Sequence, residues 1–276
     1  MLEEWLRANM AVWEELTGVH AASTFYDVEG FKNGAETLTS IELEELGPDV
    51  GQGTRLLHLQ CHFGLDTLSW ARHGATVTGI DFSEEAVGLA RRLADEVGLS
   101  SRARFLRSNV YDLPDVLEGE FDVVFTSWGV LTWLGDLRRW AQVAARYVRP
   151  GGTFYIAEFH PLVFILDDAA RPGDLRLGYP YFQGPEPTRF DEPGSYADPD
   201  AETRNTVTYE WNHPLGEVVT RLIEAGLEIE HLHEFPHTRG LAFAFLEKGE
   251  DGWQRIPGRE DDYPLSFSLR ARRPAG

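Results

Sequence analysis

Apolar and polar positions alternate in blocks along the middle of the chain. Short, nearly unbroken apolar runs, typical of strands buried on both faces, occur at 55–59, 76–80, 103–107, 121–127 and 153–159. Between them, apolar residues recur three and four positions apart, which predicts helices at 66–72, 84–97 and 136–148. Strands joined by helical crossovers run parallel, so this pattern predicts a doubly wound α/β sheet.

The flanking segments predict a helical N-terminal part and an insertion. An amphipathic helix is expected at 2–17, an aromatic-rich loop at 18–34 and a short helix at 37–46. Residues 160–205 are rich in proline, glycine, aspartate and aromatic residues, and they are too long for a simple connection. Because disordered segments are usually poor in aromatic residues, we interpret this insertion as an ordered cover.

The C-terminal part continues the alternation of strands and helices. Strands are predicted at 206–211, 227–234 and 265–271, with a helix that Asn212 caps and that runs to Ala225. We therefore divide the chain into four parts. These are an N-terminal helical cover at 1–50, a nucleotide-binding core at 51–159, an insertion at 160–211 and a segment at 212–276 that completes the sheet.

Charge and cysteine content limit the possible functions of the protein. The 276 residues carry 45 acids against 25 bases, a formal net charge of −20, which disfavours nucleic acid or an anionic membrane as a partner. Cys61 is the only cysteine, so the chain can form no internal disulfide. Its acidic beginning is unlike a signal peptide, and we expect a cytoplasmic protein.

The stretch from Arg55 to Asp81 carries the first functional signal. Its tight turn, Cys61 to Gly64, joins the end of a strand to the start of a helix, where free N–H groups favour an anion. Asp81 ends the neighbouring strand, where a carboxylate can accept hydrogen bonds from ribose hydroxyls. The pattern therefore predicts a site for a nucleoside with an anionic tail.

Five elements in order give the chain a family resemblance. They are HLQCHFGLD after the first strand, Asp81, then SNVYDLP, FDVVFTS and the RPGG turn. In this order and spacing, the region from Arg55 to Phe159 resembles the class I S-adenosylmethionine (SAM)-dependent methyltransferases. The resemblance implies a mainly parallel seven-stranded sheet with an antiparallel last strand. It also implies SAM as methyl donor, S-adenosylhomocysteine (SAH) as product and a small molecule as methyl acceptor.

The first loop departs from the family pattern of acid-x-glycine-x-glycine-x-glycine. His58 replaces the acid, Gln60 and His62 replace two glycines, and only Gly64 remains. The resemblance also implies donor contacts, to which we add Tyr26 from the aromatic N-terminal loop. The resulting candidates are Cys61, His62, Gly64, Asp66, Asp81, Phe82, Asn109, Val110, Ser127 and Tyr26. In this set Asn109 would accept the adenine amino group and Val110 would pack on the ring.

A general base is needed only if the acceptor loses a proton, and histidine suits that role near neutral pH. His160, directly after the fifth strand, is the preferred candidate, ahead of His20, His213 and His237. His231, His233 and His237 also suggest a metal triad, but ordinary strand histidines explain their spacing better, and we expect no metal.

Two other functions remain open at this point. A SAM-binding protein that transfers no methyl group would tolerate the altered first loop. An NAD(P)-dependent oxidoreductase would also use Asp81 for a ribose, but it should carry GxGxxG where this chain has CHFGLD. The sequence does not identify the acceptor, the atom that is methylated or the oligomeric state.

Overall fold

A computed structural model describes residues 2–276 and is built on one seven-stranded sheet. Its strands are β1 (Arg55–Leu59), β2 (Thr76–Asp81), β3 (Ala103–Arg107), β4 (Phe121–Ser127), β5 (Val148–Phe159), β8 (Glu228–Phe235) and β11 (Ser266–Arg272). They lie in the order β3-β2-β1-β4-β5-β11-β8, with β11 antiparallel to both neighbours and β1 to β5 parallel. The predicted fold class is confirmed.

Helices cover both faces of the sheet. The α-helices are α1 (Leu2–Ala22), α2 (Val28–Lys32), α3 (Ser40–Glu45), α4 (Leu65–Arg72), α5 (Glu84–Glu96), α6 (Leu137–Tyr147) and α7 (Leu215–Glu224). The 3₁₀ turns are η1 (Gly47–Asp49), η2 (Val110–Asp115), η3 (Leu131–Trp133) and η4 (Val163–Ile165). Within residues 2–276, no helix combines the length and apolarity that crossing a membrane requires.

The alternation of side chains along β1 shows why its apolar run is unbroken. Leu57 and Leu59 belong to the core beneath α6 and α7, whereas Leu56 belongs to the core on the opposite face, with Trp70 of α4. All four of these side chains are fully buried. A strand between two helical layers needs apolar residues at every position, and this is the pattern that predicted it.

Three predicted boundaries were wrong. Helix α1 extends to Ala22, so His20 lies on a helix rather than in a loop. The RPGG segment belongs to β5, where the pairing with β4 shifts register between Phe121 and Val123. Helix α7 follows Pro214 and is not capped by Asn212, whose backbone N–H donates to the Gln183 side chain instead.

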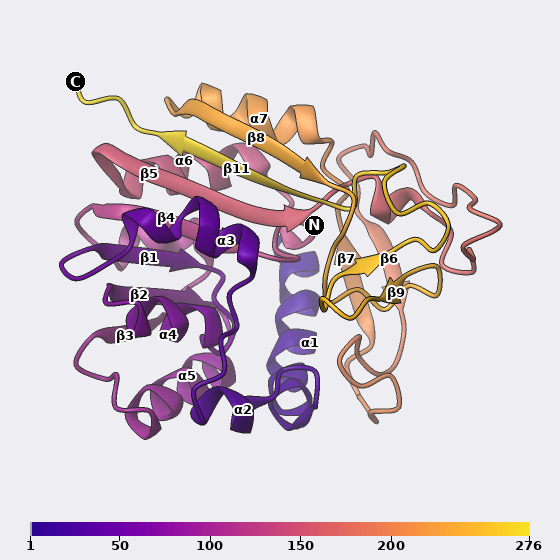
Figure 1. Cartoon of the computed structure of the whole chain (residues 1–276), viewed down its shortest axis with the longest axis horizontal. Helices are drawn as coiled ribbons and strands as arrows, with labels where there is room; N and C mark the ends of the chain where they lie inside the picture. Colours follow the sequence, from indigo (N-terminus) through magenta and orange to yellow (C-terminus); the bar gives the residue numbers. More distant parts are fainter. Residues whose placement is uncertain (1) are drawn as a thin grey trace.

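The segments that leave the sheet gather beyond the carboxyl ends of the parallel strands, with α1 between them and the sheet (Figure 1). Residues 160–211 contain the antiparallel hairpin of β6 (Thr188–Asp191) and β7 (Val207–Glu210). Residues 236–265 make a second excursion with β9 (Glu247–Lys248) and β10 (Gln254–Arg255), which the sequence did not predict. We refer to these two excursions together as the cover.

Candidate active site

A cavity of about 830 Å³ lies where the parallel strands end, enclosed by α1, the first loop and the cover. Parallel α/β sheets usually bind ligands at this edge. Of the ten predicted donor contacts, eight line the cavity. They are Tyr26, Cys61, His62, Gly64, Asp66, Asp81, Phe82 and Ser127.

The first loop keeps a glycine-type backbone with two residues that are not glycine. The φ angles are 57° at Gln60, 50° at His62 and 80° at Gly64, all in the left-handed region. That conformation costs roughly 1–2 kcal/mol for a residue with a side chain. At Gly64 a Cβ atom would lie 2.6 Å from the Phe105 ring, so only this position also requires glycine for space.

Hydrogen bonds hold the strained loop in place. The Cys61 N–H donates to the Ile80 carbonyl at 2.8 Å, and the His62 N–H donates to Asp81 Oδ2 at 2.9 Å. Asp81 Oδ1 accepts from the Ser83 N–H at 2.9 Å. Each carboxylate oxygen retains a further lone pair, so Asp81 can still accept from a ligand hydroxyl. Burial raises the pKa of Asp81 to about 6.

A buried polar cluster occupies the cavity wall near the start of α4. Ser127 donates to Asp66 Oδ2 at 3.3 Å, and Glu42 accepts from the Trp128 indole at 3.2 Å. Burial, followed by the Asp66 charge, raises the pKa of Glu42 to about 7, and the Arg239 charge opposes that shift. Glu42 and Arg239 were missed because each becomes relevant only when distant segments meet.

His62 joins the first loop to α1 and the cover. Its Nε2 lies 2.9 Å from His20 Nδ1, and His20 Nε2 lies 2.6 Å from the Ser195 hydroxyl. Burial lowers the pKa of His20 to about 4, so this chain of contacts is neutral at physiological pH. The hydroxyls of Tyr26 and Tyr196 meet beside it. The residue that replaces a family glycine therefore holds α1 and the cover against the loop.

Asn109 and Val110 do not reach the cavity. The Asn109 side chain accepts the Tyr111 N–H at 3.0 Å and thereby caps η2, while Val110 is buried in the core beneath α6. The local turn thus uses one lone pair of the amide oxygen and the core uses the valine, and the adenine contacts of both residues stay a prediction.

The preferred base, His160, also lies outside the cavity lining. Its Nε2 is 2.9 Å from Glu234, and its Nδ1 accepts the Leu162 N–H at 3.1 Å. Both ring nitrogens are engaged by β8 and by the turn after β5. Contrary to expectation, the structure thus gives His160 a role in joining these segments and no contact with the cavity.

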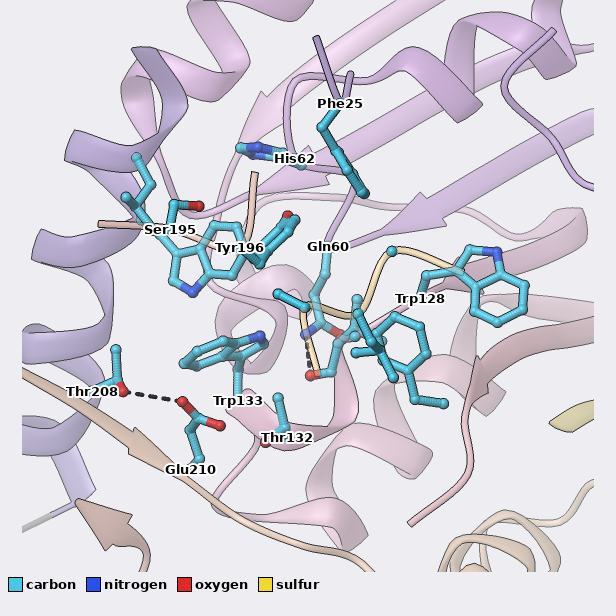
Figure 2. Close-up of a pocket in the computed structure, with 18 of the residues that line it drawn as sticks. Phe25, Gln60, His62, Trp128, Thr132, Trp133, Ser195, Tyr196, Thr208 and Glu210 are labelled. Atoms are coloured by element: carbon cyan, nitrogen blue, oxygen red, sulfur yellow. Dashed lines mark hydrogen bonds between the residues drawn. The ribbon is translucent and has the colours of Figure 1, made fainter. Parts of the chain in front are cut away.

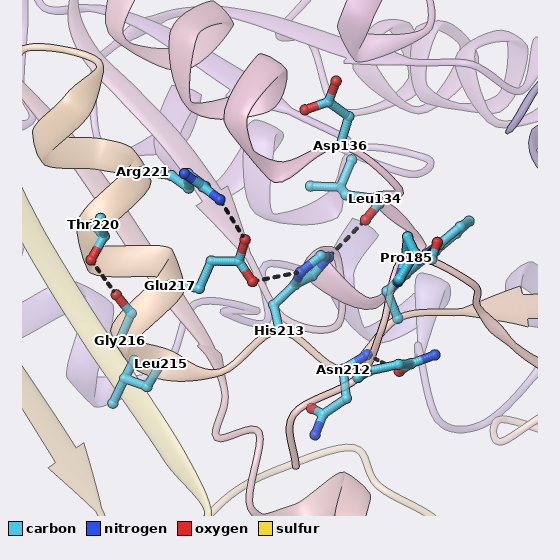
Figure 3. A network of polar contacts seen from close by, with 12 residues as sticks. Leu134, Asp136, Pro185, Asn212, His213, Leu215, Gly216, Glu217, Thr220 and Arg221 are labelled. Atoms are coloured by element: carbon cyan, nitrogen blue, oxygen red, sulfur yellow. Dashed lines mark hydrogen bonds and ion pairs between the residues drawn. The ribbon is translucent and has the colours of Figure 1, made fainter. Parts of the chain in front are cut away.

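His213 is engaged in a structural junction as well. Figure 3 shows its ring between the Leu134 carbonyl and Glu217 of α7. Its Nε2 lies 2.7 Å from that carbonyl oxygen, which can only accept a hydrogen bond, so this nitrogen carries the proton. His213 therefore connects α7 to the segment after η3 rather than serving as a base in the cavity.

His231, His233 and His237 do not come together as a triad, because His237 packs against Trp253. Instead, His231 and His233 stack on β8 and face Glu45 of α3. Glu45 lies 2.7 Å from His233 Nδ1 and 3.6 Å from His231 Nε2. Among residues 2–276 this is the group whose ligand atoms lie close enough to hold a metal ion.

Sequence reasoning also missed the wall of the cavity opposite the first loop. Glu210 and Thr208 of β7 lie beside Trp133 and Thr132 of η3, and Gln60 lies on the other side of Trp133 in this view (Figure 2). The only signal for β7 was its strand periodicity, which does not indicate which side chain meets a ligand.

Comparisons with known proteins agree with this geometry. Residues 57–156 match the family described as "Methyltransferase domain". A ubiquinone biosynthesis O-methyltransferase from Aeromonas salmonicida is 31% identical over 154 residues, which cover 54% of this chain and 63% of that protein. The chain thus aligns with less than two thirds of this curated relative.

Solved structures extend the likeness to most of the chain. An S-adenosylmethionine-dependent methyltransferase from Mesorhizobium loti is similar, with 24% identity and a TM-score of 0.57 over 88% of this chain and all of that one. The cyclase SpnF matches with 19% identity and a TM-score of 0.52 over 95% of this chain and 81% of that one. The chain has the fold of the class I SAM-dependent methyltransferases, and residues 57–156 are similar in sequence to a methyltransferase domain.

Proposed function

We propose that the protein is a SAM-dependent methyltransferase that acts on a small molecule. The backbone of the first loop carries this proposal, because it keeps three left-handed residues beneath the cavity although two of them are not glycine. Such strain persists only where the surrounding structure enforces it, and it is typical of ligand sites. Likeness of fold alone does not define the reaction, which depends on the residues of the site.

The residues of the cavity suit the ribose and the charged end of SAM. Asp81 would bind the ribose hydroxyls, Phe82 would lie beside the nucleoside, and the loop from Cys61 to Gly64 would contact the methionine part. SAM supplies a methyl group on a positively charged sulfonium. Acidic residues in the lining favour a cationic donor, and enclosure by α1 and the cover would exclude water from the reaction.

The division of the chain belongs to the same proposal. Residues 1–50 and 160–211 would close the site, 51–159 would bind the donor, and 212–276 would complete the sheet. The net charge of −20 supports a small-molecule acceptor rather than a nucleic acid, and we infer a cytoplasmic location.

Calorimetric titration with SAH, and with NADH as control, tests the donor class. We expect saturable binding of SAH alone. Binding of NADH alone would replace the proposal with the oxidoreductase alternative. SAH binding without methyl transfer to any member of a broad acceptor library would favour a SAM-binding protein that is not an enzyme.

A further inference from the structure

We propose that the methyl acceptor is an amine and that Glu210 binds its ammonium group and then removes a proton from it. This inference rests on the proposed function, and it adds the acceptor class and a catalytic residue on the cover.

Glu210 lies on the wall of the cavity. It ends β7, and its carboxyl group points from the hairpin toward Trp133 (Figure 2). Glu210 Oε1 accepts a hydrogen bond from the Thr208 hydroxyl at 3.1 Å, and Thr132 lies close by. No arginine, lysine or histidine pairs with this carboxyl group among residues 2–276. Glu210 is half-buried, and a carboxylate partly removed from water without a cationic partner is destabilised, which a cationic ligand would offset.

Other polar atoms of the cavity lining also accept hydrogen bonds. Gln60 lines the cavity, its Nε2 donates to the Val130 carbonyl at 3.3 Å, and its Oε1 is buried without a partner among the described residues. Thr208 already donates to Glu210. The remaining lone pairs of the Glu210 carboxylate therefore favour a ligand group that donates hydrogen bonds. An ammonium group has three donors and a positive charge, whereas a hydroxyl has one donor and no charge.

The charges around this end of the cavity have one sign. Burial, followed by the charges of Glu192 and Asp168, which also line this end, raises the pKa of Glu210 to about 7. Arg239 lies instead by Asp66 and Glu42. The acids of the whole lining are Asp27, Glu36, Asp66, Asp81, Asp168, Glu192 and Glu210. This field repels a carboxylate acceptor and attracts a cation.

Aromatic rings complete the cation site. Trp133 packs edge-on against Trp13 of α1, with ring centroids 5.2 Å apart, and both line the cavity. Indole faces attract ammonium groups, most strongly when water is excluded. The acceptor is therefore expected to be an amine on an apolar or aromatic skeleton.

The reaction requires only the amine, SAM and the Glu210 carboxylate. The bound ammonium gives one proton to the Glu210 carboxylate, which frees the nitrogen lone pair. The nitrogen then bonds to the methyl carbon of SAM while the carbon–sulfur bond breaks, and its electron pair stays on sulfur, giving the neutral thioether SAH. The product leaves as the methylated ammonium ion, and Glu210 returns its proton to water. A carboxyl group with a pKa near neutrality suits this transfer.

The test is calorimetric titration of the SAH-loaded protein with two matched sets of probes. Benzylamine is compared with benzyl alcohol and benzoate, and tryptamine with tryptophol and indole-3-acetate. We expect an amine to bind at least tenfold more tightly than its alcohol and carboxylate analogues. Glu210→Gln should lower amine affinity about tenfold or more and leave SAH affinity unchanged. Glu202→Gln, an exposed acid of the same excursion, is the matched control and should change neither.

A second readout tests whether binding of the ammonium ion is linked to ionisation of Glu210. Repeating the amine titration near pH 7 in two buffers with different ionisation enthalpies should reveal proton release by the wild type and none by Glu210→Gln. The inference is overturned if the alcohols or carboxylates bind as well as the amines, if no amine binds the SAH-loaded protein, or if Glu210→Gln binds amines like the wild type. Failure of SAH to bind would instead overturn the proposed function, and this inference with it.

Discussion

The sheet and the cover are held together by different forces. In the sheet, side chains such as Leu57 and Phe125 are fully buried between helices, and the strands bond to one another through their backbones. The cover has a smaller apolar cluster around Val163 and Phe245, exposes large apolar residues such as Phe182, which is 80% exposed, and contacts α1 through Trp5 and several polar groups. The Asn9 side chain both donates to and accepts from the Tyr209 backbone, at 2.7 and 2.8 Å.

Because of this difference, the contacts that stabilise the sheet are distinct from the contacts that control access to the site. Burial of apolar surface is large and non-directional, so the sheet should unfold as a unit. The polar ties between α1 and the cover are few, and those at Glu15 are exposed, so this part of the cover can open locally at a small cost. A site closed by such ties can exchange its ligands while the sheet stays folded. Four predictions test this comparison, beginning with the largest effect.

Phe125→Ala in the sheet should cost about 3–5 kcal/mol of unfolding free energy, because the lost ring leaves a cavity between β4 and the α4 layer. Phe182→Ala on the cover should change the stability by less than about 0.5 kcal/mol, because that ring is mostly in solvent. Urea unfolding of both variants measures the difference. Similar losses in the two variants would contradict the comparison.

The contact between α1 and the cover should depend on pH through His20. Its pKa is about 4 in the folded protein against 6.5 for an ordinary histidine, so between these values the unfolded chain binds more protons. Stability is therefore fully present above pH 6.5 and falls as the pH drops toward 4. His20→Gln should make the decline over this window shallower, as measured by urea unfolding at a series of pH values. An unchanged slope would exclude His20 as its source.

Asp81→Ala should weaken SAH binding by about 1–3 kcal/mol, because it removes the proposed ribose hydrogen bonds together with the acceptor of the His62 N–H. Asp81→Asn keeps an acceptor oxygen and should lose less. Calorimetry gives both affinities, and circular dichroism verifies the fold. Affinity equal to the wild type in Asp81→Ala would remove Asp81 from the donor site.

The smallest effect is expected at Glu15, which ties α1 to the cover. Its carboxylate accepts the Arg204 and Asn205 N–H groups at 2.8 and 2.9 Å, and these bonds lower the pKa of Glu15. The tie is therefore complete above about pH 4.5 and weakens as the pH falls below that value.

Glu15→Gln should accelerate hydrogen exchange at Arg204 and Asn205 without changing the midpoint of global unfolding. Glu14→Gln, at the preceding position of α1, serves as the comparison. Unaltered exchange at both amides would show that other contacts hold this part of the cover.

The parts of the site that depend on the local sequence pattern were predictable from the sequence. The positions of the first loop and of Asp81 follow from strand ends, which apolar runs mark clearly. Asn109 and His160 lie outside the cavity lining, and their polar atoms have partners nearby, in the Tyr111 backbone and in Glu234. The type of a residue and its place at a strand end do not reveal which neighbouring group its polar atoms will bond to.

The sequence by itself determined the sheet, its helical layers and the loop beneath the cavity, because each depends on periodicity, caps and turns within a few residues. Only the tertiary structure decided that His20 of α1 meets His62, that Arg239 reaches Asp66 and that Glu210 faces Trp133. These contacts join segments far apart in the chain through a few directional polar groups. Such pairings leave no periodic trace in the sequence, since each partner would be an ordinary surface residue without the other.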